Sequence, residues 1–290
     1  MIRTLARLRP LWSVVLVVSL LLIPLMLVGL VPPGWASGAA AVIVVTALLL
    51  GVAPRSPQHR PLTMVAPVHG SWLAVNSPGQ RLPSHGTRAL GQYAAIDLIR
   101  AGTSDTARML RPGWRGTPPE EFSTFGAGIH AMAAGRVIRA HSRAPDHRAR
   151  NTRPALLFMT TVEAFLRSLG GARALYGNHV IVAQEGGSFA VYAHLRQDSV
   201  TVECGDRVVV GQQLAEAGNS GNSSLPHLHV HLMDRADPNA AAGLTMVWDN
   251  VACSGEIDGH LAGIAKPPSG NALAAMPRNG EVFLVRGADG

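Results

Sequence analysis

The chain has 290 residues, of which 47% are hydrophobic, and this length accommodates one sizeable domain with accessory segments. Its formal net charge of +7 comes from scattered arginines, since Lys266 is the only lysine. A nucleic-acid-binding surface needs clustered basic residues interleaved with aromatic ones, so this composition argues against a nucleic-acid partner.

The N-terminal part of the chain, residues 1–53, is mostly apolar and predicts a membrane anchor. Residues 11–31 carry no charge and, at about 1.5 Å per residue, would span roughly 31 Å as a helix, which matches a bilayer core. A second apolar run at 35–53 is shorter and rich in alanine. We therefore expect one or two transmembrane helices and a lipid bilayer as partner. A cleaved signal peptide is the alternative for 11–31, although its apolar core would measure only about 7–15 residues.

The charges around these two runs leave the membrane topology open. Arginines precede the first run and follow the second, at Arg55 and Arg60, and none lies between them. For a hairpin that crosses twice, the positive-inside rule predicts that both ends are cytoplasmic. If only the first run crosses, the rest of the chain lies outside.

The remainder of the chain has the pattern of a mainly β protein. Residues 54–61 contain three prolines and read as a linker. Short β-branched runs follow, separated by Gly, Pro, Asn and Asp, for example at 135–140, 179–183 and 189–194. Many short strands at close spacing predict an antiparallel β-sandwich or roll, which we assign to residues 62–250. Residues 251–290 are expected to form a strand-containing C-terminal tail.

One stretch departs from this strand pattern. Between residues 155 and 169 several apolar residues fall on one face at helical spacing, namely Phe158, Val162, Phe165, Leu166 and Leu169. They predict an amphipathic helix within an insertion at about 141–175. We expect a packed excursion from the sheet, and a lid over a substrate groove is the alternative.

The two cysteines, Cys204 and Cys253, do not form a metal-binding pattern such as C-x-x-C. They could pair in a disulfide if the domain is exported, or remain as two small buried hydrophobic residues. The sequence leaves both possibilities open.

Three residues suited to metal binding and proton transfer lie in the run Pro226-His227-Leu228-His229-Val230-His231. In a β-strand, residues i and i+2 point to the same face, so the three histidines of this run share a face. One of them could bind a metal while its neighbour handles protons on a bound water. A turn of small residues at 218–224 would leave the entrance to this strand open.

A catalytic zinc takes three protein ligands and leaves its fourth position to water, so one histidine needs two further ligands. The sequence offers His85, in a Pro- and Gly-containing loop, and Asp97, at the end of a run with strand character. A carboxylate flanked by Ile96 and Leu98 on a half-buried strand needs a partner, and a metal would supply one.

These residues belong to a set of short motifs that resembles one known family, the lysostaphin-type zinc endopeptidases of peptidase family M23. The resemblance covers about residues 67–248, in an order and spacing that make the set specific. Its motifs are Gly135-Arg136-Val137, Gly177-Asn178-His179-Val180, Tyr192-Ala193-His194-Leu195, Gly205-Asp206-Arg207-Val208, Gly211-Gln212, Gly218-Asn219-Ser220-Gly221 and Pro226-His227-Leu228-His229.

The resemblance implies a small antiparallel β-fold with a groove over one zinc ion held by His85, Asp97 and His229. His194 and His227 match the family's two non-ligand histidines, which act on the zinc-bound water. The family cuts peptide bonds in bacterial cell-wall peptidoglycan. We therefore expect a membrane-anchored zinc metalloendopeptidase, a hydrolase of the bacterial cell membrane whose catalytic domain is extracytoplasmic and whose substrate is peptidoglycan.

Two features of this assignment leave alternatives. His85 and Asp97 are twelve positions apart, whereas the family's usual first motif places the two ligands four apart, and His69 is therefore a rival for His85. A non-catalytic membrane-tethered regulator or wall-binding module is the alternative function. His231 is expected to be a partly buried strand residue, with the orientation of a neighbouring histidine as its other possible role. Oligomeric state, the scissile bond and the role of the tail stay open.

Overall fold

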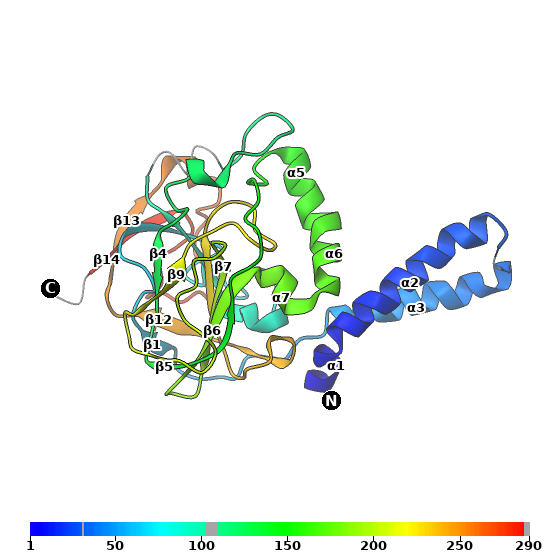
Figure 1. Cartoon of the computed structure of the whole chain (residues 1–290), viewed down its shortest axis with the longest axis horizontal. Coiled ribbons are helices and arrows are strands. Elements are labelled where there is room, and N and C mark those ends of the chain that lie inside the picture. Colours follow the sequence, from blue (N-terminus) through cyan, green and yellow to red (C-terminus); the bar gives the residue numbers. More distant parts are fainter. Residues whose placement is uncertain (31, 103–108, 287–290) are drawn as a thin grey trace.

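A hairpin of apolar helices projects from a β-domain in the computed structural model of this chain (Figure 1). The structure describes residues 1–30, 32–102 and 109–286. Val31, at the end of the expected first membrane segment, and residues 287–290 of the expected tail lie outside these ranges.

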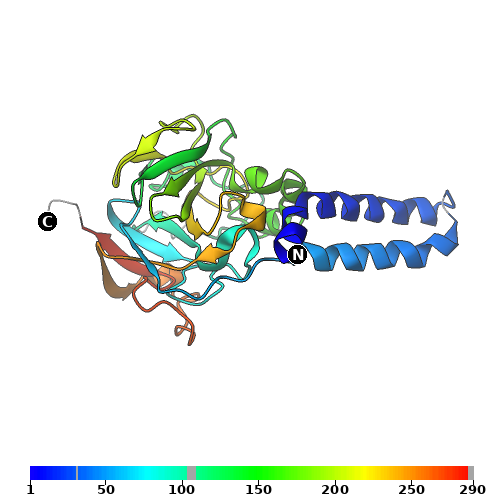
Figure 2. The same ribbon diagram turned by 90° about the horizontal axis from the view of Figure 1, so that it is seen from below.

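The hairpin is built from the two apolar runs. Its elements are α1 (Ile2–Arg7), α2 (Arg9–Leu27), the short η1 (Pro33–Trp35) and α3 (Ala36–Leu50). Within the described residues α2 alone is long and apolar enough to cross a membrane, by length and composition only. The 15 residues of α3 span about 22 Å, less than a bilayer core of about 30 Å. Figure 2 shows the two helices side by side, with their connection at the end remote from the β-domain.

The start of the chain is tied to the β-domain at the base of this hairpin. Arg3 forms an ion pair with Asp234 at 2.7 Å, and Arg7 forms one with Asp237 at 2.9 Å. A guanidinium that donates two bonds to one carboxylate, as Arg3 does to Asp234, is a directional contact. The N-terminus and the β-domain therefore lie at the same end of the hairpin.

A mostly antiparallel ten-stranded sheet forms the centre of the domain, so the predicted mainly β class is confirmed. The finer description as a sandwich or roll stays a prediction. The sheet runs in the order β13 (Val251–Ile257), β14 (Glu281–Val285), β2 (Gly70–Val75), β3 (Ile96–Arg100), β10 (Leu228–Met233), β7 (Phe189–Leu195), β6 (Asn178–Gln184), β5 (Gly135–His141) and β8 (Arg207–Val208), with β11 (Gly243–Leu244) beside β10. Two further pairs are β1 (Leu62–Met64) with β12 (Met246–Trp248), in parallel, and β4 (Gly128–His130) with β9 (Gln213–Glu216).

The central strands are buried on both faces, which explains their near-continuous apolar sequence. On β10, Leu228, Val230 and Leu232 point into the main core, which also contains Ile96 and Leu98 of β3. The alternate residues of the same strands point to the opposite face, where the histidines gather. Because β14 pairs with β2, the segment expected as a separate tail extends this same sheet.

Neither expectation for the cysteines is correct. Cys204 and Cys253 are both exposed and both free. Cys204 lies in the turn before β8, at one end of the sheet order, and Cys253 lies on β13, at the other end. The width of the sheet therefore separates the two thiols.

The insertion contains one broken helix, which we call the insertion helix, residues 153–169. It consists of α5 (Arg153–Phe158), the π-turn η4 (Met159–Glu163) and α6 (Ala164–Leu169), and α7 (Gly171–Tyr176) follows it. Glu163 binds Arg150, just before the helix, at 2.9 Å and Arg167, one turn further along the helix, at 2.8 Å. On the predicted apolar face Phe158, Val162 and Leu166 are exposed, whereas Phe165 and Leu169 are half-buried, so this face packs on the rest of the chain only in part.

The ion pairs of Glu163 make a stability contribution that depends on pH. Burial alone would raise the pKa of Glu163, but hydrogen bonds and charge from Arg150 and Arg167 lower it from 4.5 to about 2. A folded-state pKa below the unfolded value means that the stabilisation is complete above about pH 4.5 and is lost as the pH falls towards 2.

We therefore expect Glu163→Gln to lower the Tm of the full chain in detergent at pH 7 by about 2–4 °C, the shift for a loss of about 1 kcal/mol. The difference from wild type should shrink between pH 4.5 and pH 2. The same change at the exposed Glu203 is the control. A difference that stays constant over this pH range would contradict the assignment.

Candidate metal centre

The site is organised around the pairing of β3 with β10. In the register of these two antiparallel strands, Asp97 stands directly opposite His229. Directly opposite residues share a face of the sheet, so both side chains leave the sheet on the same side. Asp97 Oδ1 and His229 Nδ1 are 2.8 Å apart. Strand register alone thus brings together two residues that are 132 positions apart.

His85 reaches the same carboxylate from a loop. The neighbouring Ser84 donates its hydroxyl to the Ala95 carbonyl at 2.6 Å, and its backbone N–H donates to the Tyr93 carbonyl at 3.1 Å. These bonds fold the twelve-residue segment back onto the start of β3. His85 Nε2 then lies 3.0 Å from Asp97 Oδ2.

The rival His69 lies elsewhere. It is exposed and contacts His130 with the two rings tilted, their centroids 4.1 Å apart. In the part of the chain that the structure describes, the groups able to hold a metal include His85 and not His69.

Asp97 is buried and surrounded by nitrogen atoms. In addition to His85 and His229, Asn76 Nδ2 donates to its Oδ2 at 2.8 Å, and His227 Nε2 lies 3.6 Å from its Oδ1. Burial alone would raise the pKa of Asp97, but the charges of His85 and His227 and the hydrogen bonds from the histidines hold it well below its usual value. The carboxylate is therefore ionised across the physiological range.

The two other histidines of the site are fixed by backbone carbonyls. His194 Nδ1 donates to the Ser220 carbonyl at 2.9 Å, and His227 Nδ1 donates to the Leu225 carbonyl at 2.7 Å. Because a carbonyl can only accept, each Nδ1 carries the proton and each Nε2 keeps a lone pair. The rings of His194 and His227 lie 4.8 Å apart beside the carboxylate.

His231 forms a hydrogen-bonded chain behind His229. Its Nε2 donates to the Leu90 carbonyl at 3.1 Å, which leaves its Nδ1 as an acceptor for His229 Nε2 at 3.2 Å. With a metal ion on its Nδ1, the atom that faces Asp97, His229 would carry its proton on Nε2 and donate it to His231. His231 is fully buried, so the expectation of a partly buried strand residue is wrong.

Burial also determines the charge of these rings. Desolvation lowers the pKa of His229 and, together with the charges of His227 and His229, holds the pKa of His194 well below its usual value. Neutral imidazole is the form that binds a metal or accepts a proton. The lowered pKa values of His194 and His229 favour their neutral forms beside the ionised Asp97 carboxylate.

The residues fit a zinc ion by their chemistry and spacing. His85, Asp97 and His229 offer ligand atoms that all lie within 4.8 Å of one another. Two imidazoles and one carboxylate are a donor set of catalytic zinc, which sits about 2.0–2.2 Å from each ligand atom. His194, His227 and His229 form a second such group. The first group contains the carboxylate, and a buried anion favours a cation beside it.

A cavity of about 240 Å³ opens over these residues. Besides the charged and imidazole groups, Met159 of the insertion helix and Leu175 and Tyr176 of α7 line it. Sequence reasoning missed Asn76 and Met159 as site residues. Neither carries a local signal, since Asn76 is brought in by a turn after β2 and Met159 by the placement of the helix.

Part of the chain matches one known protein family. Residues 161–240 match the model of Peptidase family M23, so the predicted resemblance is confirmed. The matched range contains His194, His227 and His229, and it begins after His85 and Asp97 in the sequence.

Several solved structures are similar to part of the chain. The catalytic domain of the antimicrobial peptidase lysostaphin from Staphylococcus simulans is 18% identical over 46% of this chain and 86% of that chain, with a TM-score of 0.28. The catalytic domain of the prophage-encoded M23 protein EnpA from Enterococcus faecalis is 23% identical over 49% and 85%, with a TM-score of 0.28. The M23 metalloprotease pseudoalterin, from the deep sea, is 15% identical over 67% and 82%, with a TM-score of 0.34. These scores are below 0.5, so the structures add nothing to the family match.

The hydrogen-bonded chain through His231 generates a prediction for metal affinity. His231→Phe removes the acceptor of His229 Nε2 and frees the ring to adopt the other tautomer. We expect zinc affinity, measured by competition with a chelator, to fall about 10–100-fold. His231→Gln should recover part of it, since its amide can accept from His229 and donate to Leu90. Equal affinities for wild type and a folded His231→Phe variant would contradict this role.

Proposed function

We propose that this chain, whose residues 161–240 match peptidase family M23, is a zinc-dependent endopeptidase that hydrolyses peptide bonds in bacterial cell-wall peptidoglycan. The observation that carries the proposal is the meeting of His85, Asp97 and His229 around one point, with His194 and His227 beside them. These residues come from a loop and from strands β3, β7 and β10 or the residues next to them. Their convergence is explained if they bind one metal ion and transfer protons beside it.

One zinc ion per chain would be held by His85 Nε2, the Asp97 carboxylate and His229 Nδ1. When bound, zinc acts as a Lewis acid and lowers the pKa of a bound water to about 7. His85 and His229 would contribute imidazole nitrogens, and Asp97 would contribute the negative charge that holds the dication in a buried position. His231 keeps His229 in the tautomer that this arrangement requires.

His194 and His227 are proposed to handle protons and the charge that develops on the substrate. Their Nδ1–H groups are held by the Ser220 and Leu225 carbonyls, so their Nε2 atoms are free to accept a proton. Positioned imidazoles of this kind serve as general bases and, once protonated, as donors to an oxyanion or a leaving amine. The low pKa of His194 keeps its ring neutral and ready to accept.

Membrane attachment through the hairpin is part of the proposal. A domain that cuts wall peptides must face the wall, so we place it on the extracytoplasmic side. The ion pairs of Arg3 with Asp234 and Arg7 with Asp237 hold the N-terminus on the same side as the domain. They also neutralise two of the arginines that the positive-inside rule would retain in the cytoplasm.

The ligand set can be tested by metal content. We expect His85→Ala, Asp97→Asn and His229→Ala to abolish retention of zinc after dialysis, because each leaves only two protein ligands. His260→Ala, at an exposed position, is the control and should retain one zinc per chain. Retention of zinc by all three variants would contradict the assignment of these residues as the zinc ligands.

The roles of the non-ligand histidines give a separate prediction. His194→Ala should keep the zinc and lose cleavage of peptidoglycan fragments by about 10²–10⁴-fold, the range for a general acid–base residue. Cleavage is measured by mass spectrometry of released peptides. A zinc-loaded wild-type chain that leaves every wall peptide uncut would favour the non-catalytic regulator instead.

Membrane topology is tested by reporter fusions before Met1 and after Gly290. Alkaline phosphatase is active only outside the cytoplasm, so we expect activity from both fusions, because the N-terminus and the domain share one end of the hairpin. A reporter that works only inside the cytoplasm, such as green fluorescent protein, should be dark at both positions. Cytoplasmic signals from both ends would contradict a role at the wall.

A further inference from the structure

The insertion helix is oriented with its polar side inwards. Glu163, Arg150 and Arg167 form a network between the helix and the domain, and Met159 is buried against the metal cavity. A helix on the surface of a soluble domain normally has the opposite polarity, with its apolar stripe on the core. The domain leaves the apolar residues on the outer side of this helix uncovered.

The outer face of the helix is a continuous apolar strip. Phe158, Val162 and Leu166, which recur at intervals of four residues, are 49%, 48% and 56% exposed, and Leu157 beside them is 65% exposed. Scattered apolar residues are ordinary on a protein surface, but a contiguous strip marks an interaction site. We call these four residues the apolar strip.

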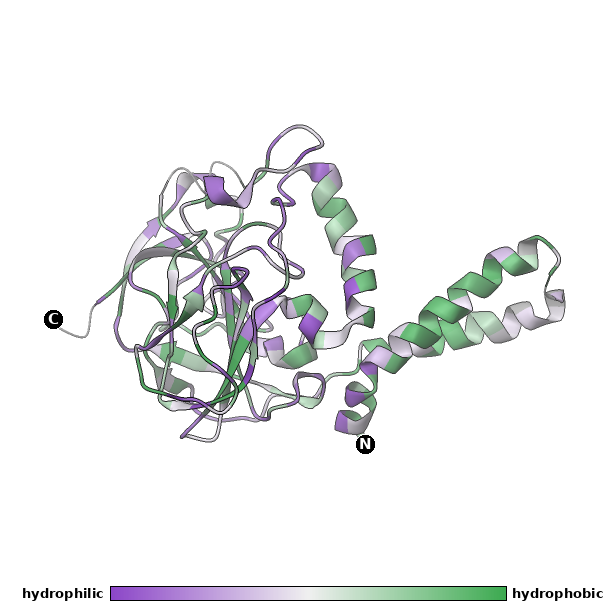
Figure 3. Ribbon diagram, viewed as in Figure 1, coloured by the Kyte–Doolittle hydropathy of each residue, from purple (hydrophilic) through white to green (hydrophobic). Residues whose placement is uncertain are grey.

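The strip adjoins the hairpin. The C-terminal half of the insertion helix, α6, packs on the first turns of α2, where the Ser168 and Ser13 hydroxyls lie 3.4 Å apart. Figures 1 and 2 both place the helix on the side of the domain from which the hairpin departs, and it runs across the hairpin direction. Figure 3 shows hydrophobic residues along the insertion helix as well as along the hairpin.

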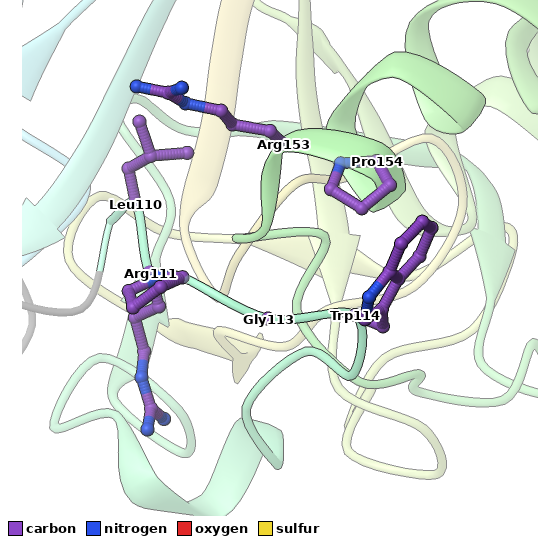
Figure 4. A pocket seen from close by; sticks show the side chains of 7 residues that line it. Leu110, Arg111, Gly113, Trp114, Arg153 and Pro154 are labelled. Carbon is purple, nitrogen blue, oxygen red and sulfur yellow. The ribbon is translucent and has the colours of Figure 1, made fainter.

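Exposed tryptophan and arginine residues lie around the N-terminal end of the helix, and we call them the rim. Trp114 is 86% exposed and lies beside Pro154, the second residue of the helix, as Figure 4 shows. Arg111 and Arg153, both exposed, line the same hollow. Tryptophan and arginine are enriched where apolar surface meets lipid headgroups.

We propose that the apolar strip is a lipid-binding surface that lies in the interface of the bilayer in which the hairpin is embedded. This inference rests on the membrane attachment in the proposed function. A bilayer is favoured over a second copy of the chain because the helix that carries the strip packs on α2 of the apolar hairpin, crosses the hairpin direction, and begins beside a basic and aromatic rim. An amphipathic helix that lies in the membrane plane buries its apolar face about 5–10 Å into the headgroup boundary.

This arrangement has a consequence for the substrate. Met159 lines the metal cavity, whereas Phe158 and Val162 face outwards on the same helix. The helix alone then separates the cavity from the lipid, a distance of about one helix diameter, or 10–12 Å. Substrate peptides would reach the cavity alongside the bilayer surface, which selects the membrane-proximal layer of the wall.

The test uses the full chain reconstituted in vesicles of phosphatidylcholine and phosphatidylglycerol. Cys204 and Cys253 are replaced by serine, and single cysteines are introduced at Phe158, at Val162 and, as control, at the exposed Glu203. Each is labelled with an environment-sensitive fluorophore. We expect the labels at 158 and 162 to shift to the blue and to lose about half of their intensity with doxyl-labelled lipid, because they lie in the interface. The label at 203 should respond only to aqueous iodide.

Three outcomes would overturn the inference. Labels at 158 and 162 that respond to iodide as the control does would place the strip in water. Labels shielded from iodide but insensitive to doxyl lipid would indicate a protein partner or a second copy. A chain that does not float with the vesicles would contradict membrane attachment itself.

A charged variant separates this surface from the catalytic proposal. Phe158→Glu with Leu166→Glu changes exposed positions only, so folding and zinc content should match wild type. We expect the label at 162 to lose its response to doxyl lipid in this variant, while the hairpin still floats with vesicles. Zinc binding and peptide cleavage by the detergent-solubilised chain are measured in parallel, so a failure of the lipid contact is distinguished from a failure of the peptidase.

Discussion

The cross-strand contact between Asp97 and His229 is the interaction on which the site depends. A buried carboxylate is costly unless hydrogen-bond donors or a cation compensate it, and Asp97 is held by His229, His85 and Asn76 together. The register of β3 against β10 fixes the first of these contacts. A slip of one residue would turn Asp97 into the apolar core and Leu98 into the site, so register and chemistry are coupled.

Around this contact, residues with left-handed backbone conformations orient a carbonyl and a side chain towards the site in ways that a regular strand does not allow. Leu90, with φ of +56°, turns its carbonyl towards His231, and His194, with φ of +60°, interrupts the alternation of β7. Left-handed conformations are unfavourable for residues with a side chain and persist where surrounding contacts enforce them. Tyr176 contributes such a contact, since its hydroxyl donates to the Leu90 carbonyl at 2.9 Å. Carbonyls oriented in this way determine which nitrogen of each histidine carries the proton.

The sequence predicts the parts of this arrangement that arise from local periodicity. Alternation along β10 puts His227, His229 and His231 on one face, and the apolar runs predict the strands. The sequence offers His85 as a candidate but leaves His69 as its rival, because the approach of His85 depends on Ser84 folding the loop back to β3. The tautomer role of His231 needs the Leu90 carbonyl, which is distant in sequence. Helical spacing predicts that the insertion helix has an apolar face, but spacing contains no information on which way that face points.

Strand β10 also connects the candidate metal centre to the apolar hairpin. His229 and His231 lie on the strand, and Asp234, directly after its last residue, binds Arg3 at the start of the chain. At about 3.4 Å per residue, the five positions from His229 to Asp234 correspond to about 17 Å of extended chain, so the centre stands at a fixed height above the hairpin base. The insertion helix provides a second connection, since Met159 lines the cavity while the far end of the helix packs on α2. Two independent links between the hairpin and one small cavity argue that the fold specifies the position of the candidate centre relative to the hairpin.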